Sequence, residues 1–98
     1  MAELRWTAEA QLWLQEIHQY IAQDNSKAAA EVVQGIYQRA QVLADFPQIG
    51  HRHDALPGAE VRVLLYGHYR IAYRIKPSDD IDILGVFHGA MRMEHYIK

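Results

Sequence analysis

The spacing of apolar residues changes once along the chain, near residue 47, and this change constrains the fold more than any other feature. Before it, apolar residues recur three and four positions apart, as on one face of an α-helix. After it, they alternate with polar residues, as in β-strands with one buried face. The sequence therefore predicts an α+β fold in which helices come first and an antiparallel sheet follows.

Two amphipathic helices are predicted, over residues 8–23 and 27–45. Thr7 is a favoured N-cap for the first helix, and Asn25 or Ser26 can cap the second, because short polar side chains accept hydrogen bonds from the free amides of a first turn. A proline follows the second helix and ends it. The link between the helices is short, so we expect an antiparallel helical hairpin.

Three strands are predicted after the helices, over residues 61–66, 69–76 and 81–87, because these segments are rich in β-branched and aromatic residues. Short turns join them into an antiparallel meander. Residues 3–6 form a short extended segment that can pair with this sheet, and residues 47–60 are predicted to be a loop. The helical hairpin should cover one face of the sheet and leave the other partly open.

The alternation within the middle strand, YRIAYRIK, assigns its side chains to two faces. Apolar positions should face the helices, whereas Arg70, Arg74 and Lys76 should be exposed on the open face. A strict two-residue turn before this strand pairs Arg62 with Tyr73, on the covered side, and a bulged turn moves Arg62 to the open side. The residues expected in the core are Leu14, Ile17, Val33, Ile36, Leu43, Ile71, Tyr73, Ile83 and Phe87.

Composition excludes several classes of protein. The chain has 98 residues, which predicts one domain over residues 1–98, and it has no cysteine for disulfides or thiolate metal sites. A net charge of −2 argues against a globally basic nucleic-acid binder. Without a long apolar run or a secretory leader pattern, the chain is expected to be soluble and cytoplasmic, away from membranes.

Cofactor and metal signals are weak. No phosphate-binding loop, dinucleotide fingerprint or nucleophile elbow is present, so we expect no cofactor. The sequence His-Arg-His at residues 51–53 offers two imidazoles but lacks a convincing third ligand, so no metal site is expected.

Polar residues of the second half could form a functional site. Arginine presents a planar donor fork suited to phosphate or carboxylate, and a histidine after a buried strand could act as an acid or base near neutral pH. The competing interpretation is that His88 only caps its strand. The candidates are Arg62, Arg70, Arg74, Lys76, His88, Arg92, His95 and Tyr96.

An ordered set of segments resembles the RelE/ParE superfamily of bacterial toxins from type II toxin–antitoxin modules. These segments are YIAQDN at the end of the first helix, LADFPQIG at the end of the second, YRIAYRI, and a terminal VFHG. The resemblance covers nearly the whole chain. It implies the α+β fold derived above and a neighbouring antitoxin that wraps the toxin, with a homodimer or a hetero-oligomer as possible assemblies.

The superfamily contains two activities, and the resemblance carries over the ribonuclease residues only in part. Arg70 and Tyr96 match the pattern of RelE-like, ribosome-dependent mRNA endonucleases, in which His88 could supply the base. Arg62 could replace an upstream lysine of that pattern only with a one-residue shift, and Arg92 could replace an arginine that aligns with Ala90. If the chain is a ribonuclease, the expected catalytic set is therefore Arg70, His88, Arg92 and Tyr96.

ParE-like members instead poison DNA gyrase and are not known to need catalytic residues. The segments YIAQDNSKAAAEVV and LADFPQIG resemble the ParE side, so we favour a gyrase inhibitor. Two alternatives remain: an mRNA endonuclease acting on the ribosome, and a degenerate toxin that retains only antitoxin binding. The residues expected to bind the target or partner are Arg62, Arg70, Arg74, Lys76, His88 and Arg92.

Overall fold

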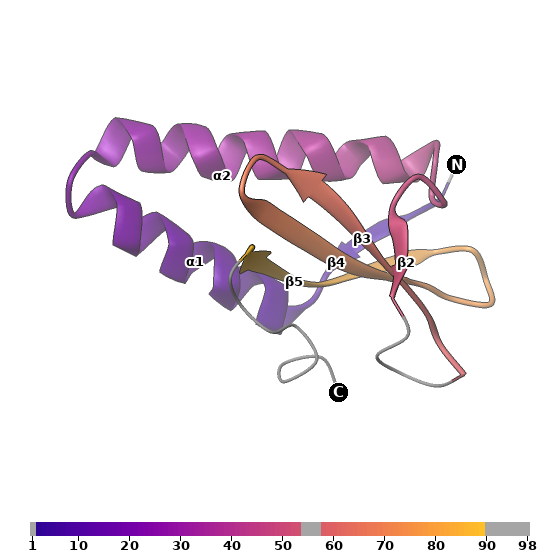
Figure 1. Cartoon of the computed structure of the whole chain (residues 1–98). Helices are drawn as coiled ribbons and strands as arrows, with labels where there is room; N and C mark the ends of the chain where they lie inside the picture. The colour runs from indigo at the N-terminus through magenta and orange to yellow at the C-terminus, as the bar shows by residue number, and fades with distance from the viewer. Residues whose placement is uncertain (1, 54–57, 90–98) are drawn as a thin grey trace.

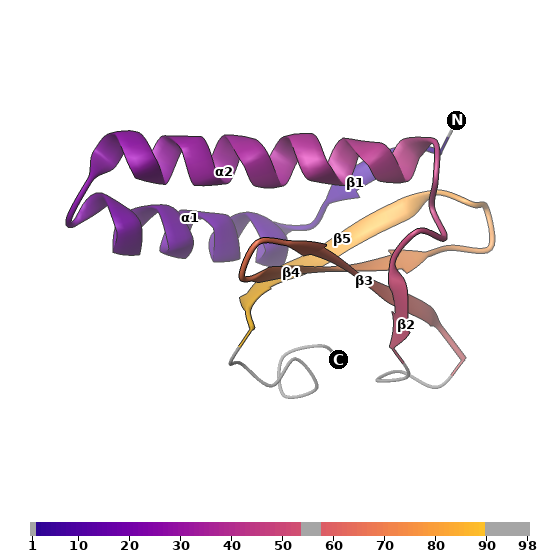
Figure 2. The same ribbon diagram turned by 45° about the horizontal axis from the view of Figure 1, so that its top comes forward.

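The computed structural model describes residues 2–53 and 58–89, and it confirms the predicted α+β arrangement (Figures 1 and 2). Its elements are, in chain order, β1 (Leu4–Trp6), α1 (Ala8–Ala22), α2 (Ser26–Gln41), a single 3-10 turn (Val42–Ala44), β2 (His51–His53), β3 (Glu60–Tyr66), β4 (Tyr69–Ile75) and β5 (Ile81–His88).

Side-chain caps fix where the two helices begin. The Thr7 hydroxyl accepts a hydrogen bond from the Ala10 amide at 3.2 Å and donates one to the Ile83 carbonyl at 2.7 Å, so it ties α1 to β5. Asn25, rather than Ser26, caps α2 by accepting from the Ala28 amide at 3.0 Å. The helices form the expected antiparallel hairpin on one side of the sheet (Figure 2).

The sheet has the strand order β1-β5-β4-β3-β2, with β1 parallel to β5 and the other neighbours antiparallel. Gly67 has a positive φ of 57° at the tight turn between β3 and β4. The expectation that residues 47–60 form only a loop is wrong, because His51–His53 pair with β3 as an edge strand. Three polar residues carry no strand pattern, and this strand exists through its pairing with β3.

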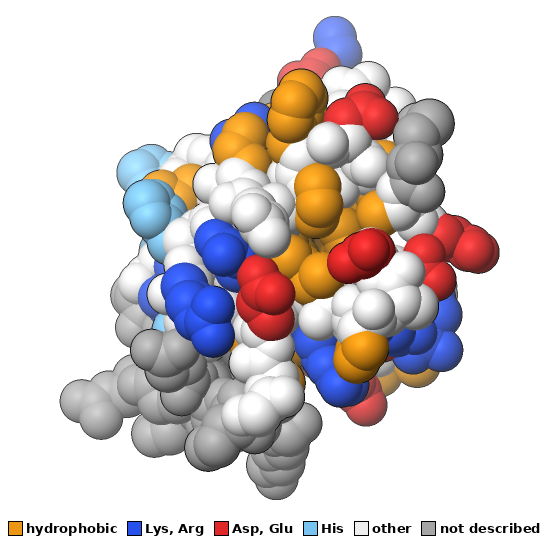
Figure 3. Space-filling model, turned by 90° about the vertical axis from the view of Figure 1, so that its right-hand side faces the viewer, with side chains coloured by type: hydrophobic (Ala, Val, Ile, Leu, Met, Phe, Trp, Pro, Cys, Tyr) orange, Lys and Arg blue, Asp and Glu red, His pale blue; other side chains and the backbone are white. Residues whose placement is uncertain are grey.

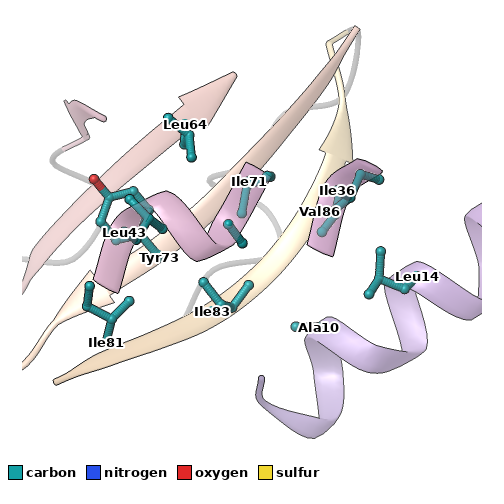
Figure 4. Packing of buried hydrophobic residues seen from close by; sticks show 11 residues of the cluster. Ala10, Leu14, Ile36, Leu43, Leu64, Ile71, Tyr73, Ile81, Ile83 and Val86 are labelled. Carbon is teal, nitrogen blue, oxygen red and sulfur yellow. The ribbon is translucent and has the colours of Figure 1, made fainter. Parts of the chain in front are cut away.

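The main core lies between the helices and the covered face of the sheet. Leu14, Ile36 and Leu43 from the helical side pack against Ile71, Tyr73 and Ile83 of the sheet, and each is nearly or fully buried (Figure 4). These six burial predictions are confirmed. Ile17 and Val33 are only partly buried, because they lie at the margins of the helical hairpin and line surface grooves.

A one-residue bulge in β5 inverts the alternation of side chains between the two faces for the rest of that strand. Tyr73 pairs with Ile83, whereas Ala72 pairs with Gly85, so Leu84 is the additional residue. Beyond the bulge, Phe87 is a neighbour of Arg70 and lies on the open face, where it is buried with Val61, Val63 and Ala72. Phe87 is thus buried as predicted, but on the opposite face from Ile83.

Candidate functional site

The alternation of β4 places Arg70 and Arg74 on the open face, opposite the helices. Arg70 lies beside Leu65 and Phe87 of the neighbouring strands, and Arg74 lies beside Val61 and Asp82. Both arginines are half-buried, as is Lys76 directly after the strand, so the expected full exposure is not observed. The prediction that these cations lie on the open face is confirmed, and neighbouring side chains partly cover them.

Asp82 lies among these cations and was missed at the level of sequence. Its carboxylate accepts two hydrogen bonds from Arg5, at 3.1 and 3.2 Å, and its Oδ1 is 3.4 Å from the Lys76 ammonium. The side chain of Asp82 is only 9% exposed. A pattern in the sequence could have identified the pair, because Arg5 and Asp82 each stand between two apolar residues of a strand and must face away from the core.

One row of register neighbours crosses the open face from edge to edge. It runs through His53, Val61, Arg74, Asp82 and Arg5. Within the described residues, the buried Nε of Arg74 and the buried Nε2 of His53 have no hydrogen-bond partner. We call this row, with Arg70 and Lys76, the cationic face. Its donors are suited to carboxylate or phosphate oxygens.

Arg62 lies on the covered side of the sheet and does not belong to the cationic face. The turn at Gly67 is not bulged, and Arg62 is the register neighbour of Tyr73 on the covered side. Its guanidinium donates to the Glu60 carboxylate at 2.9 Å and to the carbonyls of Gln48 and Gly50 at 3.2 and 2.9 Å. The bonds to Gln48 and Gly50 hold the loop before β2, and the bond to Glu60 lies within β3.

Tyr73 holds the same loop from the centre of the sheet. Its hydroxyl donates to the Pro47 carbonyl at 2.6 Å and accepts from the Gly50 amide at 3.0 Å. Burial raises the pKa of Tyr73 above its ordinary 10.0, and the hydrogen bond from Gly50 opposes that effect. The phenol is therefore neutral at physiological pH and serves as a structural link.

His88 lies on the covered side of the sheet because the bulge at Leu84 shifts the alternation of β5. It is the register neighbour of Tyr69, and its ring is 5.9 Å from the Tyr69 ring and 6.3 Å from the His68 ring. With α1 these residues form a groove of about 460 Å³, which we call the aromatic groove. Its lining consists of Trp13, Glu16, Ile17, Tyr20, Tyr69, Val86 and His88.

The structure places Arg70 and His88, two members of the expected ribonuclease set, on different faces of the sheet. Arg70 belongs to the open face and His88 to the covered side. Arg92, His95 and Tyr96 lie outside the described residues. Within residues 2–53 and 58–89, no three potential metal-binding side chains cluster, and no helix has the length and apolar character needed to cross a bilayer.

Comparisons with known proteins agree on one family. A family model described as "ParE toxin of type II toxin-antitoxin system, parDE" matches residues 4–93. Y4kP of Sinorhizobium fredii, a protein described as a candidate toxin, is 40% identical over 86 residues, which cover 88% of this chain and 86% of that protein.

Solved structures show the same fold. A chain of the chromosomal ParDE toxin–antitoxin system from P. aeruginosa is similar with a TM-score of 0.72 and 26% identity, over 90% of this chain and 96% of that one. A chain of the RelBE2 complex from Mycobacterium tuberculosis has a TM-score of 0.61 at 24% identity, over 89% and 96%, which shows a shared fold alone. Because the family model spans nearly all of the sequence, the chain belongs to the ParE toxin family of type II toxin–antitoxin systems.

Proposed function

We propose that residues 1–98 form a toxin that inhibits DNA gyrase and is neutralised by a cognate antitoxin. The family match and the similarity to a ParDE chain support the ParE side of the superfamily. Since gyrase acts on the chromosome, the proposed site of action is the cytoplasm.

The geometric observation that favours this proposal is the separation of Arg70 from His88. Cleavage of RNA by its own 2′-hydroxyl needs a base near the attacking oxygen and a cation near the phosphate that gains charge. Here the candidate base and the candidate cation belong to opposite faces of the sheet. Inhibition by binding has no such requirement, because a surface of suitable shape and charge is sufficient.

The antitoxin is proposed to use two surfaces of the toxin. The aromatic groove between α1 and the end of β5 offers apolar side chains, including Trp13 and Tyr69, to the apolar face of a partner helix. The cationic face offers Arg74 and Lys76 to acidic residues of the same partner, which would speed its capture. The aromatic groove lies where β5 ends, whereas Arg74 and Lys76 lie beside Asp82, near where β5 begins.

Two parallel assays test the target. The purified chain is incubated with gyrase and supercoilable DNA, and separately with translating ribosomes and a defined mRNA. We expect loss of supercoiling or trapped cleavage complexes in the first assay and intact mRNA in the second. Cut mRNA with unaffected gyrase would replace the proposal with the endonuclease alternative, and no effect in either assay would favour a degenerate toxin.

Charge reversal tests whether the cationic face takes part. Arg74→Glu should weaken gyrase inhibition while the chain stays folded, because Arg74 is half-buried on the open face and lies outside the main core. Lys27→Glu is the matched control, since Lys27 is exposed in α2 and away from the sheet. Equal inhibition by both variants would remove the cationic face from the proposed mechanism.

A further inference from the structure

The loop that joins the 3-10 turn to β2 exposes two large apolar side chains close together. Phe46 is 62% exposed and Ile49 is 49% exposed, although most large apolar residues of the described chain are buried or partly buried. This end of the molecule carries exposed hydrophobic side chains beside carboxylates and a hollow between them (Figure 3). A cluster of this kind on a short loop marks a candidate contact surface.

The backbone beneath these two side chains is fixed by buried polar groups. Tyr73 bonds Pro47 and Gly50, and Arg62 bonds Gln48 and Gly50, so both residues hold the same few peptides. Gly50 leaves room for this arrangement, since a Cβ there would lie 2.6 Å from the Tyr73 hydroxyl. The loop is thus ordered before any partner arrives, which lowers the entropic cost of binding through Phe46 and Ile49.

Carboxylates lie beside Phe46 and Ile49, in the direction of the β4–β5 turn. The hollow at the loop tip and the larger hollow beside it share Asp45, Pro47 and Gln48. The larger one is also lined by Glu60, Asp79 and Asp80, and Arg62 neutralises only Glu60 among them. Neither hollow has a lysine or arginine among its described lining residues. Arg74 and Lys76 line a neighbouring hollow with Glu60 and Asp79. The two hollows at the loop still have an excess of carboxylates, which favours a basic partner and disfavours nucleic acid.

We propose that Phe46, Ile49, Asp45, Asp79 and Asp80, together called the Phe46 surface, bind a protein segment that carries an apolar side chain next to lysine or arginine. The apolar side chain contacts Phe46 and Ile49, and the basic groups lie toward the three aspartates. This surface adjoins the cationic face at the β4–β5 turn, where Asp79 lines a further hollow with Arg74 and Lys76. Phe46 and Ile49 do not line that hollow. The proposal stands whether or not gyrase is the target.

Binding of synthetic peptides to the full chain tests the proposal. The probes are a fluorescent peptide of alternating leucine and lysine and a matched peptide with glutamate in place of lysine, and anisotropy gives the Kd. Phe46→Ser should weaken binding of the lysine peptide by about tenfold or more. Asp45→Asn combined with Asp79→Asn should also weaken it, and asparagine tolerates the positive φ of 71° at residue 79.

Two control variants distinguish binding at the Phe46 surface from nonspecific hydrophobic binding elsewhere on the chain. Leu12→Ser on α1 and Leu65→Ser on the open face remove side chains of similar exposure, 57% and 51%, and should leave the Kd unchanged. Melting temperatures show whether each variant stays folded. Equal binding by Phe46→Ser, equal affinity for the glutamate peptide, or absence of binding would overturn the proposal. If sedimentation shows a dimer that Phe46→Ser abolishes, the surface binds a second copy of this chain, and the proposal is overturned.

Discussion

The two faces of the sheet use the same residue type for different purposes, and Arg62 and Arg74 show the difference. Arg62 lies on the covered side, where its guanidinium makes three hydrogen bonds, two of them to carbonyls of the loop before β2. Arg74 lies on the open face, where its buried Nε has no partner within the described residues. An arginine among apolar residues thus holds a loop on one face and adds positive charge to a half-buried surface on the other.

The two faces of the sheet also differ in how many apolar residues they bury. The covered face joins helices and sheet in one large cluster, whereas the open face has a small cluster around Phe87 bordered by charges. Burial of apolar area stabilises in proportion to the area removed from water. Substitutions on the covered face should therefore act mainly on stability, and charge substitutions on the open face should act mainly on binding.

The largest expected effect is loss of core packing on the covered side. Ile36 is fully buried against the sheet, so Ile36→Ala should lower the free energy of unfolding by about 2–5 kcal/mol. Urea unfolding measures this change. Leu12→Ala, at a position 57% exposed on α1, is the control and should change stability by less than about 0.5 kcal/mol. Similar values for the two variants would contradict the assigned core.

Removing the Tyr73 hydroxyl should have the next largest effect. Tyr73→Phe keeps the ring but leaves the buried Gly50 amide without its acceptor, which should cost about 1–3 kcal/mol. Hydrogen exchange should show faster exchange of the Gly50 amide in the variant. Unchanged exchange would mean that the loop is held by Arg62 alone.

The raised pKa of Tyr73 predicts that the free energy of unfolding decreases at alkaline pH. Its pKa is raised by folding, so its contribution is fully present below the unfolded value of 10.0 and is lost as pH rises through the higher folded pKa. Urea midpoints of the wild type and Tyr73→Phe, compared at neutral pH and above pH 10.0, isolate this residue from other groups that titrate there. The difference between the two proteins should narrow as pH rises. A constant difference would contradict the raised pKa.

The two arginines give the sharpest test of the comparison. Arg62→Gln should lower stability by about 1–3 kcal/mol, because three hydrogen bonds from a charged group are lost at a side chain only 18% exposed. Arg74→Gln should change stability by less than about 0.5 kcal/mol and weaken antitoxin binding. Calorimetric melting and surface plasmon resonance measure the two quantities. If Arg62→Gln mainly weakened binding and Arg74→Gln mainly lowered stability, the roles assigned to the two faces would be reversed.

Asp82→Asn should have a small effect on stability and should change antitoxin binding in the opposite direction to Arg74→Gln. The Arg5 side chain in this ion pair is 67% exposed, so its loss should cost less than about 1 kcal/mol. The open face then gains positive charge, and association with an acidic antitoxin should become faster and more dependent on salt. A slower association rate would indicate that Asp82 orients Arg5 and Lys76 for binding.

The sequence by itself determined the helices, the strands other than β2, and most of the faces. Helical spacing followed by alternation predicted the order of helices and strands, and alternation in β4 predicted that Ile71 and Tyr73 face the helices while Arg70 and Arg74 face away. These features depend on residues a few positions apart, so local rules are sufficient.

Only the tertiary structure decided the features that depend on distant pairing. The bulge at Leu84 places Phe87 and His88 on faces that uninterrupted alternation would exchange, and Asp82 finds Arg5 through strands 77 positions apart in sequence. Tyr73 and Arg62 similarly bond a loop whose sequence gives no sign of them. The physical reason is that register, bulges and buried polar bonds are selected by how whole strands pair and pack, which a local pattern does not contain.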